Sequence, residues 1–368
     1  MTKHRAITLI ICTMIAAAIC GLVAFPLETR DAARAALTLC GGVLIPSLFP
    51  FFVLSGLLIE SGIAARAGKL CDRFMQPLFR IPGSGGSALA LGIIGGYPLG
   101  AATAIDLYAA KLCSKTEASR LLAFCNNSGP AFILGAVGVG ILGSARLGIA
   151  LYIIHVVSAL LVGMLFRFYK FDEPITVSRR TSIAPDIPFS KAFSCAVRRG
   201  LNSCLSVCAF VVFFAVFLKI LSVFRIIPLL ASPFGVNAPV AETVWFGFFE
   251  VTTGLSALGL SGADGGVVFV LTAALLGFGG LSVHAQVMSF TSEYSVPLAP
   301  YFAGKTCHAA ISALLAALTW REMPISTVTA ACMTGGSGVC ASQFWWLVPA
   351  LPIIALVLIK KHWKNRQL

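Results

Sequence analysis

The chain has 368 residues, of which 58% are hydrophobic and 11% are charged, and its mean hydropathy is +0.92. This composition excludes a water-soluble globular protein, because the apolar runs are longer than a soluble core can bury. The formal net charge of +13 would suggest a nucleic-acid partner in a soluble protein. Here the basic residues lie in short stretches between apolar segments, so they indicate membrane topology and no nucleic-acid partner. The sequence predicts an all-α polytopic membrane protein embedded in the lipid bilayer.

The first apolar run extends from Ala6 to Phe25 after the basic start Thr2–Arg5. Its length is close to the ~20 residues that a membrane-spanning helix needs. A cleaved signal peptide would begin in the same way, but no small-x-small cleavage site follows, so we expect a retained helix. The basic start places the N-terminus in the cytoplasm, and residues 28–36 are expected in a short external loop.

A second span is predicted from Leu37 to Ile59. Arg66, Lys69, Arg73 and Arg80 follow, interleaved with apolar residues at near-helical spacing. This pattern favours an amphipathic helix on the cytoplasmic membrane surface, with an ordinary solvated loop as the alternative.

The two next apolar stretches are both interrupted in the middle. The first, Ser87 to Ala110, contains Gly95-Gly96-Tyr97-Pro98, and the second, Leu121 to Leu142, contains Asn126-Asn127-Ser128-Gly129-Pro130. Irregular backbone at membrane depth persists only where protein or a water-filled space satisfies its polar groups. We therefore predict a solute-binding site formed by Tyr97, Asn126, Asn127, Ser128 and Gly129, although glycine and proline also occur in membrane helices for packing alone.

The basic loops decide how these stretches run. If Ser87 to Ala110 crossed the membrane, the basic residues of 111–120 and of 170–199 would lie outside, against the positive-inside rule. A re-entrant hairpin turning at Gly95 to Pro98 keeps both loops in the cytoplasm. Leu121 to Leu142 then crosses outward, and Leu147 to Phe168 returns.

The second half repeats this order of elements. A span from Leu201 to Leu221 precedes an interrupted stretch, Val240 to Leu260, a span from Val267 to Phe290 broken over 277–286, and a final span from Ala303 to Trp320. One constant offset also aligns four pairs of residues, namely Leu37, Cys40, Phe49 and Leu54 with Leu201, Cys204, Phe213 and Leu218. The repeat has inverted topology, as in many secondary transporters.

The domain organisation follows from these elements. Counting a last span from Phe344 to Ile359, we predict about eight transmembrane helices and two re-entrant hairpins, with both termini cytoplasmic. The predicted units are an N-terminal helix and external loop (1–36), a first repeat (37–170), a basic linker (171–199), a second inverted repeat (200–322) and a C-terminal helix with a basic tail (323–368).

Polar residues within the second repeat extend the predicted site. Glu250 lies among aromatic residues, where a carboxylate costs roughly 2.5–3.5 kcal/mol unless it is paired, protonated or hydrated. We expect it to bind a coupling proton or cation, with a structural pair or a free helix terminus as the alternative. Thr252 and Thr253 offer hydroxyls to a ligand or bond back to their own helix. Ser282, His284 and Gln286 occupy the second broken span, as Asn126 and Asn127 occupy the first, and free helix N-termini at these breaks favour an anionic or strongly polar ligand.

The twelve cysteines do not form a metal-binding or disulfide pattern, since most lie inside apolar stretches and no Cys-x-x-Cys pair exists. We expect no metal and no cofactor. An enzyme is not expected either, because the sequence contains no recognisable nucleophile with a base, metal cluster or phosphate loop. The oligomeric state stays open.

Several of these motifs together resemble a known family. They are Pro46–Phe52, Pro82–Gly85, Gly95–Ala101, Asn126–Pro130 and Gly279–Gln286, and they are similar to the YlbJ, or SpoVV, sporulation integral membrane proteins, which carry the nucleoside-recognition "Gate" domain akin to concentrative nucleoside transporters. The family usually has Asn-Ala-Ser where this chain has Asn126-Asn127-Ser128, which leaves the contact of Asn127 open.

The resemblance implies a role in endospore formation, in the cell membrane or the mother-cell-derived outer forespore membrane, with transport of dipicolinate toward the forespore. Dipicolinate is a small aromatic dicarboxylate, in line with the anion expected at the helix breaks. A symporter of nucleosides or other polar solutes, and a non-transporting assembly factor of sporulation, are the alternatives.

Overall fold

The computed structural model describes residues 3–61, 63–175 and 188–321, in which every regular element is helical. The predicted last span and the basic residues Arg179 and Arg180 lie outside this part of the chain. Because every regular element of the described residues is helical, the predicted all-α class is confirmed. Within the described residues, four helices are long and apolar enough to cross a membrane: Ala145–Phe166, Phe189–Val223, Gly265–Thr291 and Ala299–Arg321.

The first half of the chain forms an N-terminal helix, a helix in three consecutive segments, a surface helix, two short helices, a helix broken in the middle and a final long helix. Its elements are α1 (Lys3–Ala24), α2 (Pro26–Leu39), a π-helical turn (Cys40–Leu44), α3 (Ile45–Glu60), α4 (Ile63–Phe79), α5 (Gly85–Gly95), α6 (Leu99–Ala109), α7 (Lys115–Cys125), a π-helical segment (Ala131–Ile141) and α8 (Ala145–Phe166).

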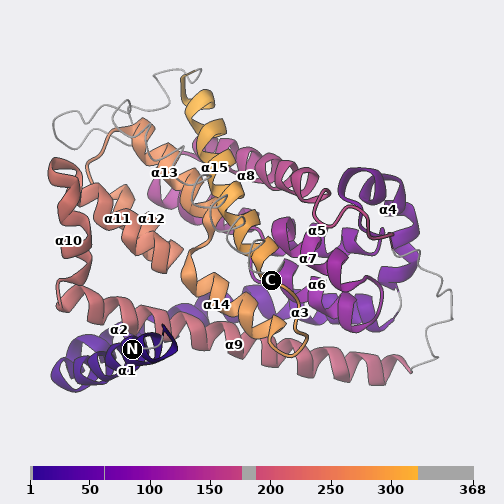
Figure 1. Ribbon diagram of the computed structural model, residues 1–368, viewed down its shortest axis with the longest axis horizontal. Helices are drawn as coiled ribbons and strands as arrows, with labels where there is room; N and C mark the ends of the chain where they lie inside the picture. Colours follow the sequence, from indigo (N-terminus) through magenta and orange to yellow (C-terminus); the bar gives the residue numbers. More distant parts are fainter. Residues whose placement is uncertain (1–2, 62, 176–187, 322–368) are drawn as a thin grey trace.

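The second half begins with the longest helix and ends with a helix that runs back through the molecule (Figure 1). Its elements are α9 (Phe189–Val223), α10 (Ile226–Ala231), a 3-10 helix (Ser232–Asn237), α11 (Ala238–Phe249), α12 (Val251–Gly259), α13 (Gly265–Phe278), α14 (Gly280–Thr291) and α15 (Ala299–Arg321).

Two stretches differ from the expected loops. The segment after the first span is the helix α2, which starts with Pro26 at its first turn and continues through alanine-rich sequence, both of which favour a helix. In the second half, α9 begins at Phe189, before the predicted span Leu201 to Leu221, and it includes Arg199. This arginine pairs with Glu60 (Nη2–Oε1, 3.0 Å) and Asp106 (Nη1–Oδ1, 3.6 Å), and so ties the start of α9 to the ends of α3 and α6.

The predicted amphipathic helix is present as α4. Met75 and Phe79 of this helix are buried, whereas Leu70 and Phe74 are 81% and 62% exposed. Large apolar side chains that face outward from an amphipathic helix fit a position against the hydrocarbon edge of a bilayer.

Helices α3 and α9 pack against each other in opposite directions. Gly56 of α3 lies against Ala196, Gly200 of α9 lies against Val53, and the Cys40 thiol is 3.9 Å from the Cys208 carbonyl oxygen. Later residues of one segment therefore meet earlier residues of the other. The absence of a side chain at the two glycines lets the helix backbones approach closely.

Each half contains a helical hairpin that packs on the following helix break or its flanks. In the first, the turn between α5 and α6 consists of Gly96, with φ +86°, and a cis Tyr97–Pro98 bond. A Cβ on either Gly92 or Gly100 would overlap the carbonyl oxygen of Cys125, so both hairpin arms touch the end of α7. The second hairpin joins α11 to α12, and Gly280 packs against its turn at Val251.

The second broken span is interrupted at one point only. Gly279 and Gly280 have φ of +90° and +77°, a conformation that residues with a side chain rarely adopt. The wider break expected over 277–286 is therefore wrong: α14 begins at Gly280, and Ser282, His284 and Gln286 lie on a regular helix.

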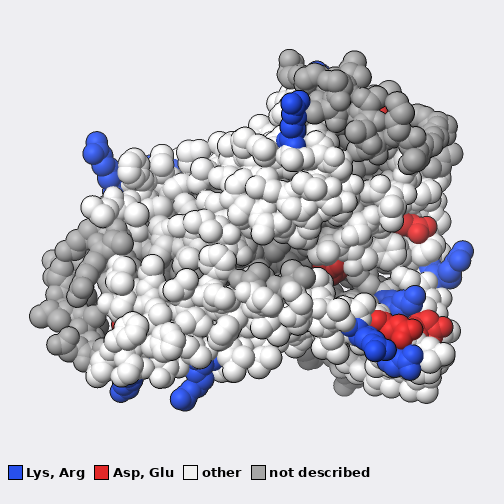
Figure 2. Space-filling model, turned by 180° about the vertical axis from the view of Figure 1, so that it is seen from behind, with Lys and Arg blue, Asp and Glu red and all other residues white. Residues whose placement is uncertain are grey.

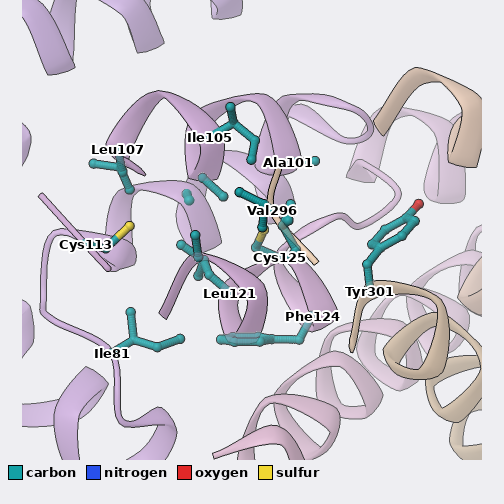
Figure 3. Close-up of a cluster of buried hydrophobic side chains, with 14 of the residues drawn as sticks. Ile81, Ala101, Ile105, Leu107, Cys113, Leu121, Phe124, Cys125, Val296 and Tyr301 are labelled. Atoms are coloured by element: carbon teal, nitrogen blue, oxygen red, sulfur yellow. The ribbon is translucent and has the colours of Figure 1, made fainter. Parts of the chain in front are cut away.

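A buried apolar cluster anchors the first broken span (Figure 3). Leu121, Phe124 and Cys125 of α7 pack there with residues of α6 and with Val296 and Tyr301 from the second half. The Tyr301 ring lies at the edge of the cluster, with its hydroxyl directed away from the other labelled side chains. Helix α15 also approaches α7 closely, because Gly304 lies against Ala123.

The surface of the molecule is broadly apolar. In Figure 2 charged side chains gather at the periphery and in one corner, and the wide middle of that face carries few of them. Several large apolar side chains are strongly exposed, such as Val23 (76%), Leu229 (70%) and Leu260 (89%). Together with the four long apolar helices, this surface is that of an integral, multi-pass membrane protein.

Candidate functional site

The first helix break lies entirely inside the protein. Between the end of α7 and Ala131, residues 126–129 leave the helical conformation, and Asn126, Asn127 and Ser128 are at most 1% exposed. The Asn127 amide donates to the Phe124 carbonyl oxygen at 2.9 Å and so satisfies an acceptor at the end of α7. Polar groups at this depth need protein partners, and α8 and α15 supply further partners for the backbone of the break and for the Asn126 side chain.

A histidine from α8 holds the backbone of this break. The Ser128 N–H donates to Nε2 of His155 at 2.9 Å. Because Nε2 accepts, the hydrogen of the neutral imidazole lies on Nδ1, an assignment that follows from the partner of the other nitrogen. Nδ1 of His155 is buried and has no hydrogen-bond partner among the described residues.

A lysine and a second histidine from α15 complete what we call the Lys–His cluster: His155, Lys305 and His308. The Lys305 ammonium donates to the Asn126 carbonyl oxygen at 3.0 Å and lies 3.4 Å from Nδ1 of His308. Nε2 of His308 lies 3.0 Å from the His155 carbonyl oxygen, so Nε2 donates there and Nδ1 accepts from the lysine. Lys305 and His308 are 0% exposed.

The tip of the first hairpin lies beside this cluster. The Lys305 nitrogen is 5.8 Å from the centroid of the Tyr97 ring, and the Tyr97 hydroxyl donates to the Leu276 carbonyl oxygen of α13 at 3.2 Å. Gly96 and Gly129 meet backbone to backbone. Of the predicted residues, Gly129 therefore lies in the break and Tyr97 next to it, and Tyr97 joins the first half to the second.

His284 reaches the same centre from α14. Its Nδ1 lies 2.7 Å from the Tyr301 hydroxyl, which is 3.5 Å from the amide nitrogen of Asn126. His284 also packs edge-on against Phe278. Ser282 and Gln286 are buried on the same helix, at 3% and 4% exposure. The break of the first half is therefore linked to α14 through Tyr301.

Glu250, Thr252 and Thr253 form a separate arrangement. The Glu250 carboxylate accepts the backbone N–H groups of Thr252 (3.0 Å) and Thr253 (2.7 Å), as well as the Thr253 hydroxyl (2.7 Å). This is the geometry of a helix N-cap, and it neutralises the positive N-terminus of α12 with the protein's own acid. Thr253 is exposed, and neither threonine has a hydrogen bond to the Lys–His cluster among those the structure describes.

The structure thus brings together most of the predicted residues and adds four that the sequence analysis missed. These four are His155, Tyr301, Lys305 and His308. Three of them are ionisable residues inside otherwise apolar spans, a pattern that by default indicates function in a membrane protein. That signal was present in the sequence, within the predicted spans Leu147 to Phe168 and Ala303 to Trp320.

The chemistry of this centre is that of polar recognition. Among the described residues no group of three or more His, Cys, Asp or Glu side chains is arranged to hold a metal ion. The centre instead combines a buried cation, three imidazoles and side-chain amides, with several buried polar atoms that have no described partner, namely Oδ1 of Asn126, Oδ1 of Asn127, Nδ1 of His155 and Nε2 of His284. Buried polar atoms are normally paired, so these atoms indicate a place where hydrogen bonds are made to something else.

Comparison with known proteins gives the chain relatives of the same kind. A family profile named Gate and described as "Nucleoside recognition" matches residues 42–177, which contain the first hairpin, the first break and α8. The curated "Sporulation integral membrane protein YlbJ" of Bacillus subtilis (strain 168) is 32% identical over 326 residues, covering 82% of this chain and 80% of that protein. No solved structure matches the chain. At this identity and coverage, the chain belongs to the family of the sporulation integral membrane protein YlbJ.

Proposed function

We propose that the chain is a transporter that moves a small anionic or strongly polar solute across a membrane during sporulation. The observation that carries this proposal is the fully buried break at Asn126–Ser128, held by His155 and Lys305 from two other helices. Broken helices whose polar backbone faces other protein elements are typical of transporter binding sites. A membrane anchor or a scaffold needs no such centre.

The internal symmetry supports the same reading. Each half has a long helix, a hairpin, a broken span and a final span, and α3 and α9 pack in opposite directions. We therefore propose two repeats of inverted topology, with the hairpins re-entrant and both termini cytoplasmic. In secondary transporters, movement of one such repeat against the other exposes a central site to each side in turn.

The substrate we favour is dipicolinate, moved toward the forespore. The name of the Bacillus subtilis relative places that protein in sporulation, and a buried cation beside helix ends suits a dicarboxylate. A nucleoside or another polar solute is the second candidate, because the matching profile is described as nucleoside recognition. A non-transporting assembly factor is the third.

Uptake by the purified full-length protein in liposomes tests this function. We expect accumulation of radiolabelled dipicolinate above that of protein-free liposomes, and competition by excess unlabelled dipicolinate but not by uridine. Uptake of uridine in place of dipicolinate would support the second candidate. Liposomes that accumulate neither solute, with folded and inserted protein, would favour the assembly factor.

The orientation has its own test. A cysteine at Lys115 should be shielded from an impermeant thiol reagent applied outside intact cells, in a protein in which Cys12, Cys20 and Cys195, exposed in the described part of the chain, are replaced together with Cys332 and Cys340, which lie outside it. Reaction of this cysteine would contradict the proposed topology. A cysteine at Arg180, outside the described residues, gives a second probe of the same side.

A further inference from the structure

Lys305 is a buried cation for which the described part of the chain provides no acidic partner. Its side chain is 0% exposed, and within the described residues no aspartate or glutamate forms an ion pair with it. Its partners are a carbonyl oxygen of Asn126 and a ring nitrogen of His308. A charged ammonium at membrane depth is costly unless an anion accompanies it, so a lysine in this position needs an explanation beyond packing.

The hydrogen bonds around it leave donors unused. An ammonium has three hydrogens, and two of them are directed at Asn126 and His308. The single N–H hydrogen of the neutral His155 ring is on Nδ1, since Nε2 accepts from the Ser128 N–H, and this buried Nδ1 has no partner among the described residues. The centroids of the His155 and His308 rings are 4.5 Å apart, so the unused hydrogens of Lys305 and His155 belong to one cluster.

We infer that the Lys–His cluster binds the carboxylate group of the transported solute, with Lys305 as its counter-ion and the His155 Nδ1–H as a second donor. A carboxylate presents two acceptor oxygens and one negative charge. The two oxygens match the unused Lys305 hydrogen and the His155 Nδ1–H, and the charge matches the Lys305 ammonium. This inference rests on the proposed function and adds the residues that bind the carboxylate of the solute, a group that a neutral nucleoside lacks.

The position of the cluster fits this role. The lysine lies between the backbone of the first break and the ring of Tyr97 at the tip of the first hairpin. It comes from α15, which belongs to the second half. A charge held at the meeting point of both halves is where a solute would be exposed to one side and then to the other.

Equilibrium binding to the purified full-length protein tests the inference with a pair of ligands that differ in charge. The probes are pyridine-2,6-dicarboxylate, its neutral analogue pyridine-2,6-dicarboxamide, and uridine, measured by calorimetry and by ligand-induced shifts in melting temperature. We expect the dicarboxylate to bind the wild-type protein at least tenfold more tightly than the dicarboxamide. Lys305→Gln keeps a donor for the Asn126 carbonyl oxygen and should abolish this preference.

Lys219→Gln is the matched control, since it removes a lysine of α9 that lines a peripheral pocket of about 370 Å³ and should leave the preference unchanged. A wild-type protein that prefers the dicarboxamide or uridine, or that binds no probe, overturns the inference, and so does a folded Lys305→Gln protein that keeps the preference. Where Lys305→Gln fails to fold, a wild-type protein without the dicarboxylate preference still overturns the inference. Liposome uptake of uridine without carboxylate preference would overturn the carboxylate site and leave the transporter function standing.

Discussion

The two halves of the chain follow the same order of elements, but the broken span of the first half and the hairpin turn of the second half satisfy their polar groups in different ways. In the first half, the side chains of Asn126, Asn127 and Ser128 are buried, and the backbone around them depends on His155 and Lys305 from other helices. In the second half, the turn at Glu250 is satisfied by its own neighbours, Thr252 and Thr253. The first break needs the rest of the protein, whereas the second hairpin supplies its own cap.

This difference indicates that the two halves do not contribute equally to the centre. The second half contributes mainly through α15 and α14, whose Lys305, Tyr301 and His284 reach the first break. Its hairpin tip stays partly exposed and internally bonded. We therefore expect changes in the first break to affect both folding and solute binding, and changes at the Glu250 turn to affect local stability.

The largest expected effect follows from the close contact of the first hairpin with the break. Gly92→Val places a branched side chain where even a Cβ would overlap the Cys125 carbonyl oxygen, and backbone cannot give way as a flexible side chain can. We expect little or no folded protein, judged by the yield of monodisperse protein after membrane extraction. Gly135→Ala is the control, because a Cβ there meets no atom within 4 Å. Equal yields from the two variants would contradict the packing described for the hairpin.

The next effect concerns the histidine that holds the first break. His155→Leu introduces an apolar side chain of similar size and removes the acceptor for the Ser128 N–H. An unpaired buried donor costs about 1–3 kcal/mol, so we expect a lower melting temperature together with reduced uptake. Ser158→Ala, one turn further on α8, removes a hydroxyl bonded only to the Ile154 carbonyl oxygen of its own helix and should change both quantities little. A stable His155→Leu protein with wild-type uptake would show that the break does not depend on this histidine.

The sequence predicted the breaks better than it predicted what surrounds them. Glycine, proline and asparagine at 95–98 and 126–130 have local effects on the backbone, so both interruptions could be located without a structure. The partners of the first break depend on how helices far apart in sequence pack, which no local pattern encodes. Lys305 and His308 are nevertheless ionisable residues in an apolar span, which is itself a sign of function. They were missed because the predicted site included only polar residues in or beside the interrupted stretches.

A smaller effect is expected at Glu250, where the coupling role predicted from the sequence and the observed cap make different predictions. Glu250→Ala removes the cap and should lower the stability by about 1 kcal/mol, measured as a change in melting temperature. Glu250→Gln retains an acceptor oxygen and should lose less. We expect uptake by the Gln variant to persist, because the carboxylate oxygens are bonded to the start of α12. Loss of uptake or of its pH dependence at an unchanged melting temperature would instead support Glu250 as the coupling residue.

The smallest expected change in stability, and the sharpest comparison of the halves, concerns Tyr97. Tyr97→Phe removes the hydrogen bond to the Leu276 carbonyl oxygen and keeps the ring beside Lys305. The matched control is Tyr152→Phe, which removes a similar bond from α8 to the Ile93 carbonyl oxygen within the first half. Each bond contributes about 0.5–1.5 kcal/mol, so the two variants should lose similar stability. If the halves move against each other during transport, only the Tyr97 bond has to break in each cycle, and Tyr97→Phe alone should change the uptake rate, by roughly two- to tenfold for the same free energy. Equal uptake rates in the two variants would show that the Tyr97 contact stays intact throughout the cycle, and that the first hairpin moves together with α13.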